Sequence, residues 1–203
     1  MYVLALTGGL GAGKSTAAGV LAERGAVVID LDDVAKAMLD EVPVVRDRVI
    51  EAFGPEVLGA DGRIDRAALA RAAFATEEAA LTLDLIVHPA ALASVAGALD
   101  ALALRAQPPR VVVLVIPLLV EAPLFLEIVD AVVTISAHED LRLERAIARG
   151  MTREDAERRI AHQAGDAERR DIADYVIEND GGVEEFQRAV ADFWDAEIEH
   201  RNS

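Results

Sequence analysis

The segment GGLGAGKS, residues 8–15, decides the fold of this chain. It satisfies the pattern G-x-x-x-x-G-K-[ST], follows the short apolar run of residues 2–6, and opens a segment of helical composition at residues 15–24. In that context the glycines let backbone N–H groups turn inward around a phosphate, and the N-terminus of the following helix favours the same anion. The alternative is a flexible glycine turn that carries GKS by chance. The strand before it and the helix after it favour a phosphate-binding loop, here called the P-loop.

The P-loop pattern assigns a role to each polar side chain at its end. Lys14 is expected to reach the β- and γ-phosphates of ATP, the Ser15 hydroxyl to ligate Mg²⁺, and Thr16 to contact the α-phosphate. ATP and Mg²⁺ are therefore the expected cofactors. The residues whose backbone is expected to hold the phosphates are Gly9, Gly11, Ala12 and Gly13.

The segments outside the P-loop predict an α/β fold. A β-branched run at residues 27–29 completes a strand–helix–strand unit, which indicates a parallel sheet. Further strands are predicted at residues 111–116, 131–135 and 175–177. The expected architecture is a P-loop NTPase fold of three layers, α/β/α, around a parallel five-stranded sheet.

Helical patterns fill the rest of the chain, which we interpret as one domain, residues 1–203. The core is expected at about 1–35, 108–138 and 170–203, a helical acceptor-binding insert at about 36–107, and a helical lid at about 139–169. The insert is predicted to hold helices at 44–53, 65–73 (capped by Asp65), 77–87 and 90–105, with Pro89 as the interruption. Capping patterns at Ser136 and Thr152 predict two lid helices, and a terminal helix is expected at 183–200.

Composition narrows the classes of partner. The 203 residues carry a formal net charge of −16, which repels nucleic acid and anionic membranes, so neither is an expected partner. Cysteine is absent, no secretory signal is recognisable, and the most apolar stretch, residues 111–120, is too short to span a bilayer. These features predict a cytoplasmic protein that acts on a small molecule, as a monomer or a homo-oligomer.

The type of P-loop protein follows from what surrounds the loop. No asparagine is followed by lysine, which argues against the guanine-reading segment of a GTPase. The apolar strand at 111–116 runs into Pro117-Leu118-Leu119, where motor ATPases carry an acidic residue. A small-molecule kinase fits best. A kinase for a nucleoside or nucleotide, and a nucleotide-binding regulator without turnover, are the rival interpretations.

Two further groups could take part in phosphoryl transfer. Asp30, Asp32 and Asp33 follow the second strand, where open α/β sheets bind ligands, and Asp30 and Asp32 point the same way if the chain stays extended. For Asp33 a helix N-cap is the better interpretation, and for Asp32 proton transfer or orientation of the acceptor hydroxyl. Residues 142, 145 and 149 are arginines on one predicted helix face, which suits either a phosphate-binding lid or a solvated, salt-bridged helix.

Seven segments, taken in order, resemble the dephospho-coenzyme A kinase family. The P-loop alone is generic, but the whole set is specific and spans nearly the entire chain. The segments are LTGGLGAGKST (6–16), VIDLD (28–32), FGPEVLGADGRIDRAAL (53–69), IVHP (86–89), VIPLLVE (115–121), RAIARGMTREDAERRIAHQ (145–163) and ADYVIENDG (173–181).

The resemblance implies phosphorylation of the ribose 3′-hydroxyl of dephospho-CoA by ATP, the last step of coenzyme A synthesis. It implies that Asp32 and Lys14 are catalytic and that Arg145 and Arg149 are lid arginines facing the nucleotide phosphates. Asn179, with Gly181 nearby, matches a loop near the adenine. The acceptor-site residues implied are Asp32, Lys36, His88, Pro117, Leu118, Leu119 and Glu121. Lys36 stands where the family usually has arginine, so an ammonium group replaces a guanidinium group that can donate two parallel hydrogen bonds.

Overall fold

The computed structural model describes residues 1–199, so His200, the predicted end of the terminal helix, lies outside the described residues. The chain forms two compact units. One unit joins Met1–Asp30 to Leu102–Ser203, and the other is Leu31–Ala101. The first unit contains the whole sheet, and the second is made of helices and turns.

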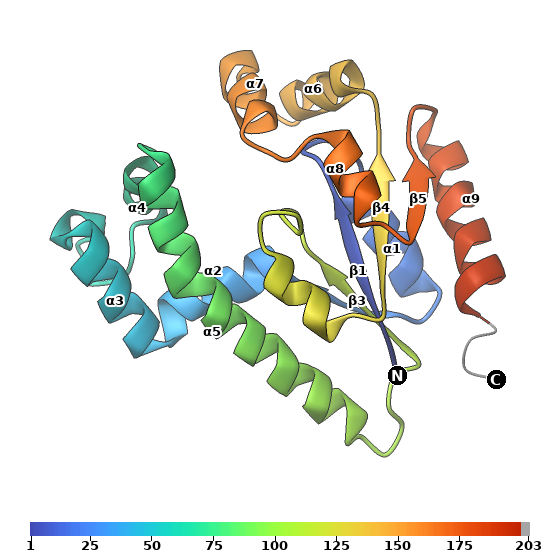
Figure 1. The fold of residues 1–203 in the computed structure, drawn as a ribbon, viewed down its shortest axis with the longest axis horizontal. Helices are drawn as coiled ribbons and strands as arrows, with labels where there is room; N and C mark the ends of the chain where they lie inside the picture. Colours follow the sequence, from blue (N-terminus) through green and yellow to red (C-terminus); the bar gives the residue numbers. More distant parts are fainter. Residues whose placement is uncertain (200–203) are drawn as a thin grey trace. The chain divides into compact units, whose positions relative to one another are not determined.

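The sheet of the first unit is parallel and five-stranded, as predicted (Figure 1). Its strands are β1 (Tyr2–Gly8), β2 (Val27–Asp30), β3 (Val111–Val115), β4 (Ala131–Ser136) and β5 (Tyr175–Glu178). The strand order is β2-β3-β1-β4-β5, and β1 is central because Leu4 pairs with both Val113 and Ala131. The carboxyl end of β1 therefore delivers the P-loop to the middle of the sheet edge where parallel α/β proteins bind ligands.

The helices of the first unit lie on both faces of the sheet. They are α1 (Lys14–Glu23), α6 (Glu139–Ala148), α7 (Arg153–Ala161), α8 (Asp166–Asp171) and α9 (Val183–Phe193), with the short turns η2 (Pro123–Ile128) and η3 (Trp194–Ile198). The helix α8 was not predicted, because six residues, five of them charged, show no apolar periodicity. The terminal helix does not stay α-helical, since it widens into a π-helical turn at η3.

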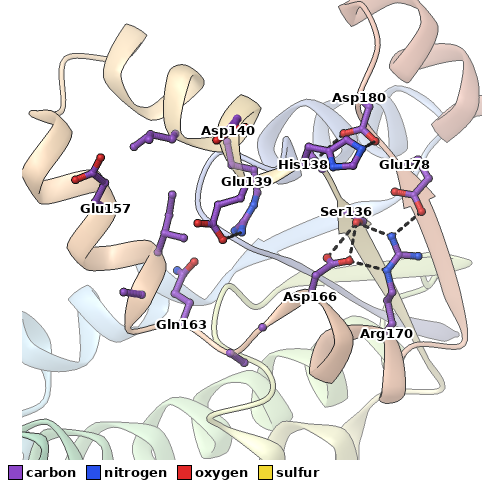
Figure 2. Close-up of a pocket in the computed structure, with 17 residues that line it drawn as sticks. Ser136, His138, Glu139, Asp140, Glu157, Gln163, Asp166, Arg170, Glu178 and Asp180 are labelled. Atoms are coloured by element: carbon purple, nitrogen blue, oxygen red, sulfur yellow. Dashed lines mark hydrogen bonds and ion pairs between the residues drawn. The ribbon is translucent and has the colours of Figure 1, made fainter.

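A polar network joins α8 to the carboxyl ends of β4 and β5 (Figure 2). Arg170 Nε donates to Asp166 Oδ2 at 2.6 Å, and Arg170 Nη2 donates to Glu178 Oε1 at 2.7 Å and to Ser136 Oγ at 2.8 Å. The Ser136 hydroxyl in turn donates to Asp166. The prediction that Ser136 caps a helix is therefore wrong: α6 begins at Glu139, its N-cap is His138, and Ser136 remains in β4.

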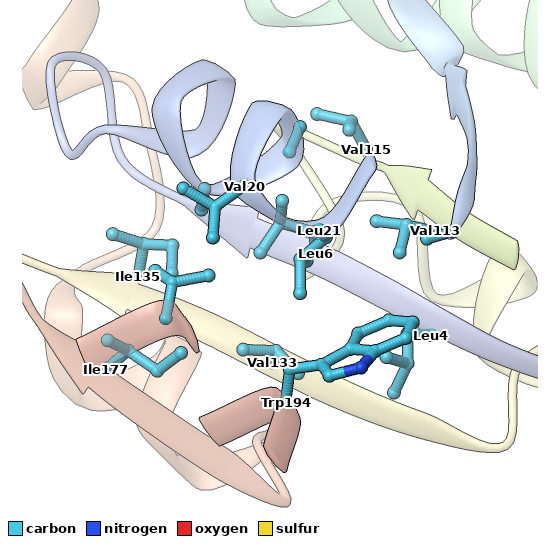
Figure 3. Close-up of a cluster of buried hydrophobic side chains, with 14 of the residues drawn as sticks. Leu4, Leu6, Val20, Leu21, Val113, Val115, Val133, Ile135, Ile177 and Trp194 are labelled. Atoms are coloured by element: carbon cyan, nitrogen blue, oxygen red, sulfur yellow. The ribbon is translucent and has the colours of Figure 1, made fainter. Parts of the chain in front are cut away.

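The apolar core of the first unit lies between the sheet and the pair α1 and α9 (Figure 3). Alternate residues of the strands, such as Leu4 and Leu6 of β1, face this layer and are buried with Leu21 of α1 and Trp194 of η3. The other face of β1 is equally buried, and Thr134 of β4 donates from that face to the carbonyl of Arg169 in α8. Burial on both faces explains why these strands read as continuous apolar runs.

The second unit contains α2 (Leu31–Glu41), α3 (Pro43–Phe53), η1 (Pro55–Val57), α4 (Arg66–Ala73) and most of α5 (Glu77–Ala103). The predicted cap is confirmed, since Asp65 Oδ1 accepts from the N–H of Ala67 at 2.9 Å and of Ala68 at 3.1 Å. The predicted interruption at Pro89 is wrong, because α5 continues through it as one helix. Residues 87, 91, 95 and 99 are buried along one face, and this packing outweighs the one hydrogen bond that a proline removes.

Helix α5 is also an apolar segment, and it is longer than the stretch 111–120. Residues Glu78–Ala103 are long and apolar enough to cross a membrane by length and composition alone, and 33% of the best window is buried inside the structure. This is weak evidence for a membrane span, because the core helix of a water-soluble protein meets the same criteria.

The Arg170 network makes a pH-dependent contribution to stability. Burial alone would raise the pKa of the Asp166 carboxyl, but hydrogen bonds from Arg170 and Ser136 outweigh it and hold the pKa below its ordinary value. A group with a lowered folded-state pKa stabilises the fold above its unfolded pKa and stops doing so as pH falls through the folded value. We therefore expect Arg170→Met to lower the free energy of unfolding by about 1 kcal/mol at neutral pH.

This loss is expected to shrink when urea unfolding is repeated at a pH below the ordinary pKa of an aspartate, because Asp166 then takes up a proton and its pairing with Arg170 weakens. Arg153→Met is the matched control, because Arg153 forms a single, exposed pair with Glu157. The control is expected to change stability little at either pH. An equal loss for Arg170→Met at both pH values would contradict the role given to Asp166.

Candidate nucleotide-binding site

The P-loop backbone is tightly enclosed by two neighbouring segments. Gly11 and Gly13 have φ angles of 76° and 112°, which only glycine adopts readily. A Cβ atom on Gly11 would overlap the backbone carbonyl oxygen of Arg142 in α6, and one on Gly13 would overlap the side-chain amide of Asn179 after β5. Glycine is required here both by conformation and by the space left between α6 and Asn179.

The polar residues at the end of the P-loop begin helix α1. Lys14 Nζ donates to the carbonyl oxygens of Gly8 at 2.6 Å and Gly9 at 3.1 Å, so its ammonium lies over the first half of the loop. The Ser15 side chain is exposed and that of Thr16 is half-buried. The first N–H groups of a helix have no partner inside the helix, so this turn can receive an anion. The predicted phosphate-binding residues therefore lie together at one helix N-terminus.

Asn179 links the P-loop to α6. Its Nδ2 donates to Ala12 O at 2.7 Å, its N–H donates to Ser136 O at 2.8 Å, and its own carbonyl oxygen accepts from Arg145 Nη1 at 2.9 Å. The side chain is only 6% exposed. The structure thus joins Arg145, Asn179 and the P-loop, and the Asn179 side chain is bonded to the loop itself. Gly181 lies two residues beyond, where the chain is exposed.

The three arginines predicted to lie on a lid differ in exposure. Arg142 is buried, Arg145 is half-buried, and Arg149 is exposed at the C-cap, beyond the last residue of α6. The predicted common face of residues 142, 145 and 149 stays a prediction, with Arg149 at the exposed end of it. Arg169 of α8 is also buried and lies near Gly9 with Arg142. Sequence reasoning missed Arg169, because nothing in the charged run 166–171 distinguishes it.

Two side chains hold the junction of α7 and α8. Gln163 Oε1 accepts from the P-loop N–H of Leu10 at 2.8 Å, and Glu121 Oε1 accepts from the N–H of Ala164 at 2.8 Å. Glu121, predicted at the acceptor site, is thus engaged with the end of the lid. Its neighbours differ in exposure: Leu119 is fully buried in the core, whereas Pro117 is half-buried and Leu118 is 39% exposed.

The predicted residues of the second unit lie on helices. Helix α2 begins at Leu31, directly after Asp30, so the chain does not stay extended and Asp32 lies in the first helical turn. The prediction that Asp33 is an N-cap is also wrong, since Asp33 lies inside the helix and accepts from Lys36 Nζ at 2.6 Å. His88 is in the middle of α5, with Nε2 3.4 Å from Asp84 Oδ1, rather than at a helix break.

A cavity of about 580 Å³ lies among α6, α7, α8 and the ends of β4 and β5 (Figure 2). Its lining includes Gln163 and the Arg170 network but no P-loop residue among those described. Six carboxylates also line it: Glu139, Asp140, Glu157, Asp166, Glu178 and Asp180. Arg142 and Arg170 also line it, but the carboxylates outnumber these two cations. This balance of charge disfavours a triphosphate in the cavity, and the P-loop stays the predicted phosphate site.

Comparison with known proteins agrees with this geometry. The sequence profile of the dephospho-CoA kinase family matches residues 2–185. A dephospho-CoA kinase from Streptomyces avermitilis is 40% identical over 99% of this chain and 96% of its own length. One from Corynebacterium diphtheriae is 38% identical over 96% of both chains.

Solved structures share the fold. The crystal structure of TT1252 from Thermus thermophilus superposes with a TM-score of 0.77 at 32% identity, covering 96% of both chains. Dephospho-CoA kinase from Campylobacter jejuni has a TM-score of 0.70 at 24% identity, covering 95% of both. From the profile match and the full-length relatives together, the chain belongs to the dephospho-CoA kinase family.

Proposed function

We propose that this chain transfers the γ-phosphoryl group of ATP to the ribose 3′-hydroxyl of dephospho-CoA, giving coenzyme A and ADP, the last step of coenzyme A synthesis. The observation that carries the proposal is the family match over residues 2–185, on a chain whose P-loop follows the central strand of the sheet. We also propose that it acts in the cytoplasm, where ATP is available.

The nucleotide phosphates bind at the P-loop in this proposal. Lys14 and the backbone N–H groups of Gly9, Gly11 and residues 13–16 donate to the phosphate oxygens, whereas the N–H groups of Leu10 and Ala12 stay with Gln163 Oε1 and Gly9 O. The N-terminus of α1 further favours the negative charge. Lys14 already lies over this loop, within 3.1 Å of the Gly9 carbonyl oxygen. Moving its ammonium from carbonyl oxygens to a phosphate exchanges weak acceptors for a charged one.

The reaction itself is an in-line displacement at phosphorus. The 3′-oxygen of the acceptor forms a bond to the γ-phosphorus while the bond to the β,γ-bridging oxygen breaks, and ADP leaves. Asp32 orients the hydroxyl and takes its proton, and Arg145 and Arg149 face the phosphates. The residues proposed for the acceptor are Lys36, His88, Pro117, Leu118 and Glu121; Leu119 contributes by packing, since its side chain is buried.

Magnesium would be held at the start of α1. Mg²⁺ usually keeps several waters and binds through substrate phosphates with few protein oxygens, and it neutralises charge on those phosphates. The exposed Ser15 hydroxyl suits this role. In the part of the chain that the structure describes, no group of three or more His, Asp or Glu side chains is placed to hold a metal ion.

The proposal is tested by incubating the protein with Mg-ATP and dephospho-CoA, with adenosine and AMP in parallel reactions, and identifying products by mass. Coenzyme A formed from dephospho-CoA alone is the expected result. Phosphorylation of adenosine or AMP instead would keep a P-loop kinase but exclude this acceptor. ATP binding without transfer to any of the three would indicate a non-catalytic regulator.

The role of Asp32 is tested by Asp32→Asn, which removes the proton acceptor with little change of shape. We expect kcat for coenzyme A formation to fall by about a hundredfold or more, and the Kd for Mg-ATP to stay unchanged. Asp47→Asn, at an exposed aspartate of α3, is the matched control and should keep the wild-type kcat. Full activity in Asp32→Asn would exclude Asp32 as the base.

A further inference from the structure

Two buried arginines lie against the first half of the P-loop. Arg142 of α6 is 6% exposed and Arg169 of α8 is 4% exposed. A Cβ atom built on Gly9 would overlap Arg142 Nη1 and would lie 3.2 Å from Arg169 Nη2. Both guanidinium groups therefore approach the same glycine, and any side chain at position 9 would displace them.

This pair of cations lacks sufficient partners within the protein. Arg142 Nη1 and Arg169 Nε are buried and have no hydrogen-bond partner among the described residues. Arg142 Nη2 is 3.7 Å from Glu139 Oε2, but the Glu139 side chain is 74% exposed, which weakens the attraction. Arg169 Nη1 donates to the carbonyl oxygen of Ala164. Two like charges packed together with unpaired donors cost stability, and an anion bound between them would offset that cost.

The electrostatics of Arg169 agree with this arrangement. Burial, and after it the charge of Arg142, lower the pKa of the Arg169 guanidinium below its ordinary value. The carboxylates of Asp166, Glu121 and Glu168 act in the opposite direction but do not cancel the effect. Asp166 is moreover engaged by Arg170 at 2.6 Å. The positive charge at Gly9 is therefore only partly balanced by the protein.

Lys14 brings a third cation to the same place, since its Nζ donates to Gly8 O and Gly9 O. Gln163 occupies the adjacent N–H of Leu10, so elements of the lid segment and α8 meet the P-loop at residues 9 and 10. In a P-loop the lysine reaches the β- and γ-phosphates. The three cations therefore surround the position expected for the end of a triphosphate.

We propose that Arg142 and Arg169 together bind the terminal phosphoryl group of the nucleoside triphosphate held by the P-loop. This rests on the proposed function, which supplies ATP as the ligand. Guanidinium groups suit the task, because each presents several donors in a plane that matches phosphate oxygens. During transfer they donate to the non-bridging oxygens while the phosphorus exchanges the β,γ-bridging oxygen for the acceptor oxygen, and they give up no proton.

The arginines near the P-loop differ in whether their donors are available to a phosphate. Arg145 is committed to the carbonyl and side-chain oxygens of Asn179, and Arg149 is exposed at the end of α6. Arg142 and Arg169 are the buried pair with spare donors next to the loop. We therefore expect the γ-phosphate to depend more on Arg142 and Arg169 than on Arg149.

The test compares the affinities of Mg-ATP and Mg-ADP by titration calorimetry without acceptor. Arg142→Gln and Arg169→Gln are each expected to weaken Mg-ATP roughly tenfold and to leave Mg-ADP within about twofold, because a charged hydrogen bond to the γ-phosphate is lost. Arg158→Gln is the matched control, since Arg158 is exposed on α7 and pairs with Asp155. Unchanged preference for ATP over ADP in both variants would overturn the proposal.

Two further measurements distinguish phosphate binding from a purely structural role of the arginine pair. Thermal unfolding of the ligand-free variants should show no loss of stability, because removing one cation relieves repulsion. If either glutamine variant does not fold, Arg142→Met and Arg169→Met replace them, because methionine also removes the charge, and wild-type ATP preference in both would refute the proposal. The variants could instead bind dephospho-CoA or inorganic phosphate more weakly while the ratio of their affinities for Mg-ATP and Mg-ADP stays unchanged. That result would assign the arginine pair to another phosphate group and would also refute the proposal.

The calorimetric test is independent of the proposed acceptor. A protein that prefers ATP through Arg142 and Arg169 but makes no coenzyme A would refute the proposed function alone. A protein that makes coenzyme A while both variants keep their ATP preference would refute the role of the arginine pair alone.

Discussion

The structure depends on how closely the P-loop backbone is packed. The loop leaves the central strand β1, passes the backbone of α6 at Gly11 and the amide of Asn179 at Gly13, and then starts α1. Because a Cβ atom at either glycine would overlap these neighbours, the loop, α6 and the end of β5 hold one another in place. The phosphate-binding N–H groups are therefore positioned by tertiary packing and not by the loop sequence alone.

The distribution of charge follows from that packing. The chain carries a net charge of −16, yet Lys14, Arg142 and Arg169 meet at the first residues of the P-loop. The neighbouring cavity among α6, α7 and α8 is lined by six carboxylates, and of these three cations only Arg142 also borders it. A strongly acidic protein can thus bind a triphosphate, because field strength at a site is set by the nearest buried charges rather than by net charge.

Sequence predicted the features that local chemistry determines. The five strands, the P-loop and the Asp65 cap could be predicted, because each follows from a short sequence pattern and the residues next to it in the chain. Three residues were misinterpreted because tertiary structure overrides the local pattern. Ser136 bonds to Arg170 instead of capping a helix, and Asp33 lies inside a helix that already starts at Leu31. Pro89 does not interrupt α5, because the helix is held by packing along its length. Arg169 could not be found, because its role comes from where α8 places it and not from its neighbours in the chain.

A crystal structure with ADP, Mg²⁺ and beryllium fluoride, which mimics the terminal phosphoryl group, tests the central claim most directly. The claim is that the P-loop end of the sheet carries a three-cation site completed by the nucleotide. We predict fluoride atoms within about 3.2 Å of nitrogen atoms of Lys14, Arg142 and Arg169. Fluoride bound by Lys14 and Arg149 would contradict this claim, if Arg142 and Arg169 stayed against Gly9 and did not contact the fluoride.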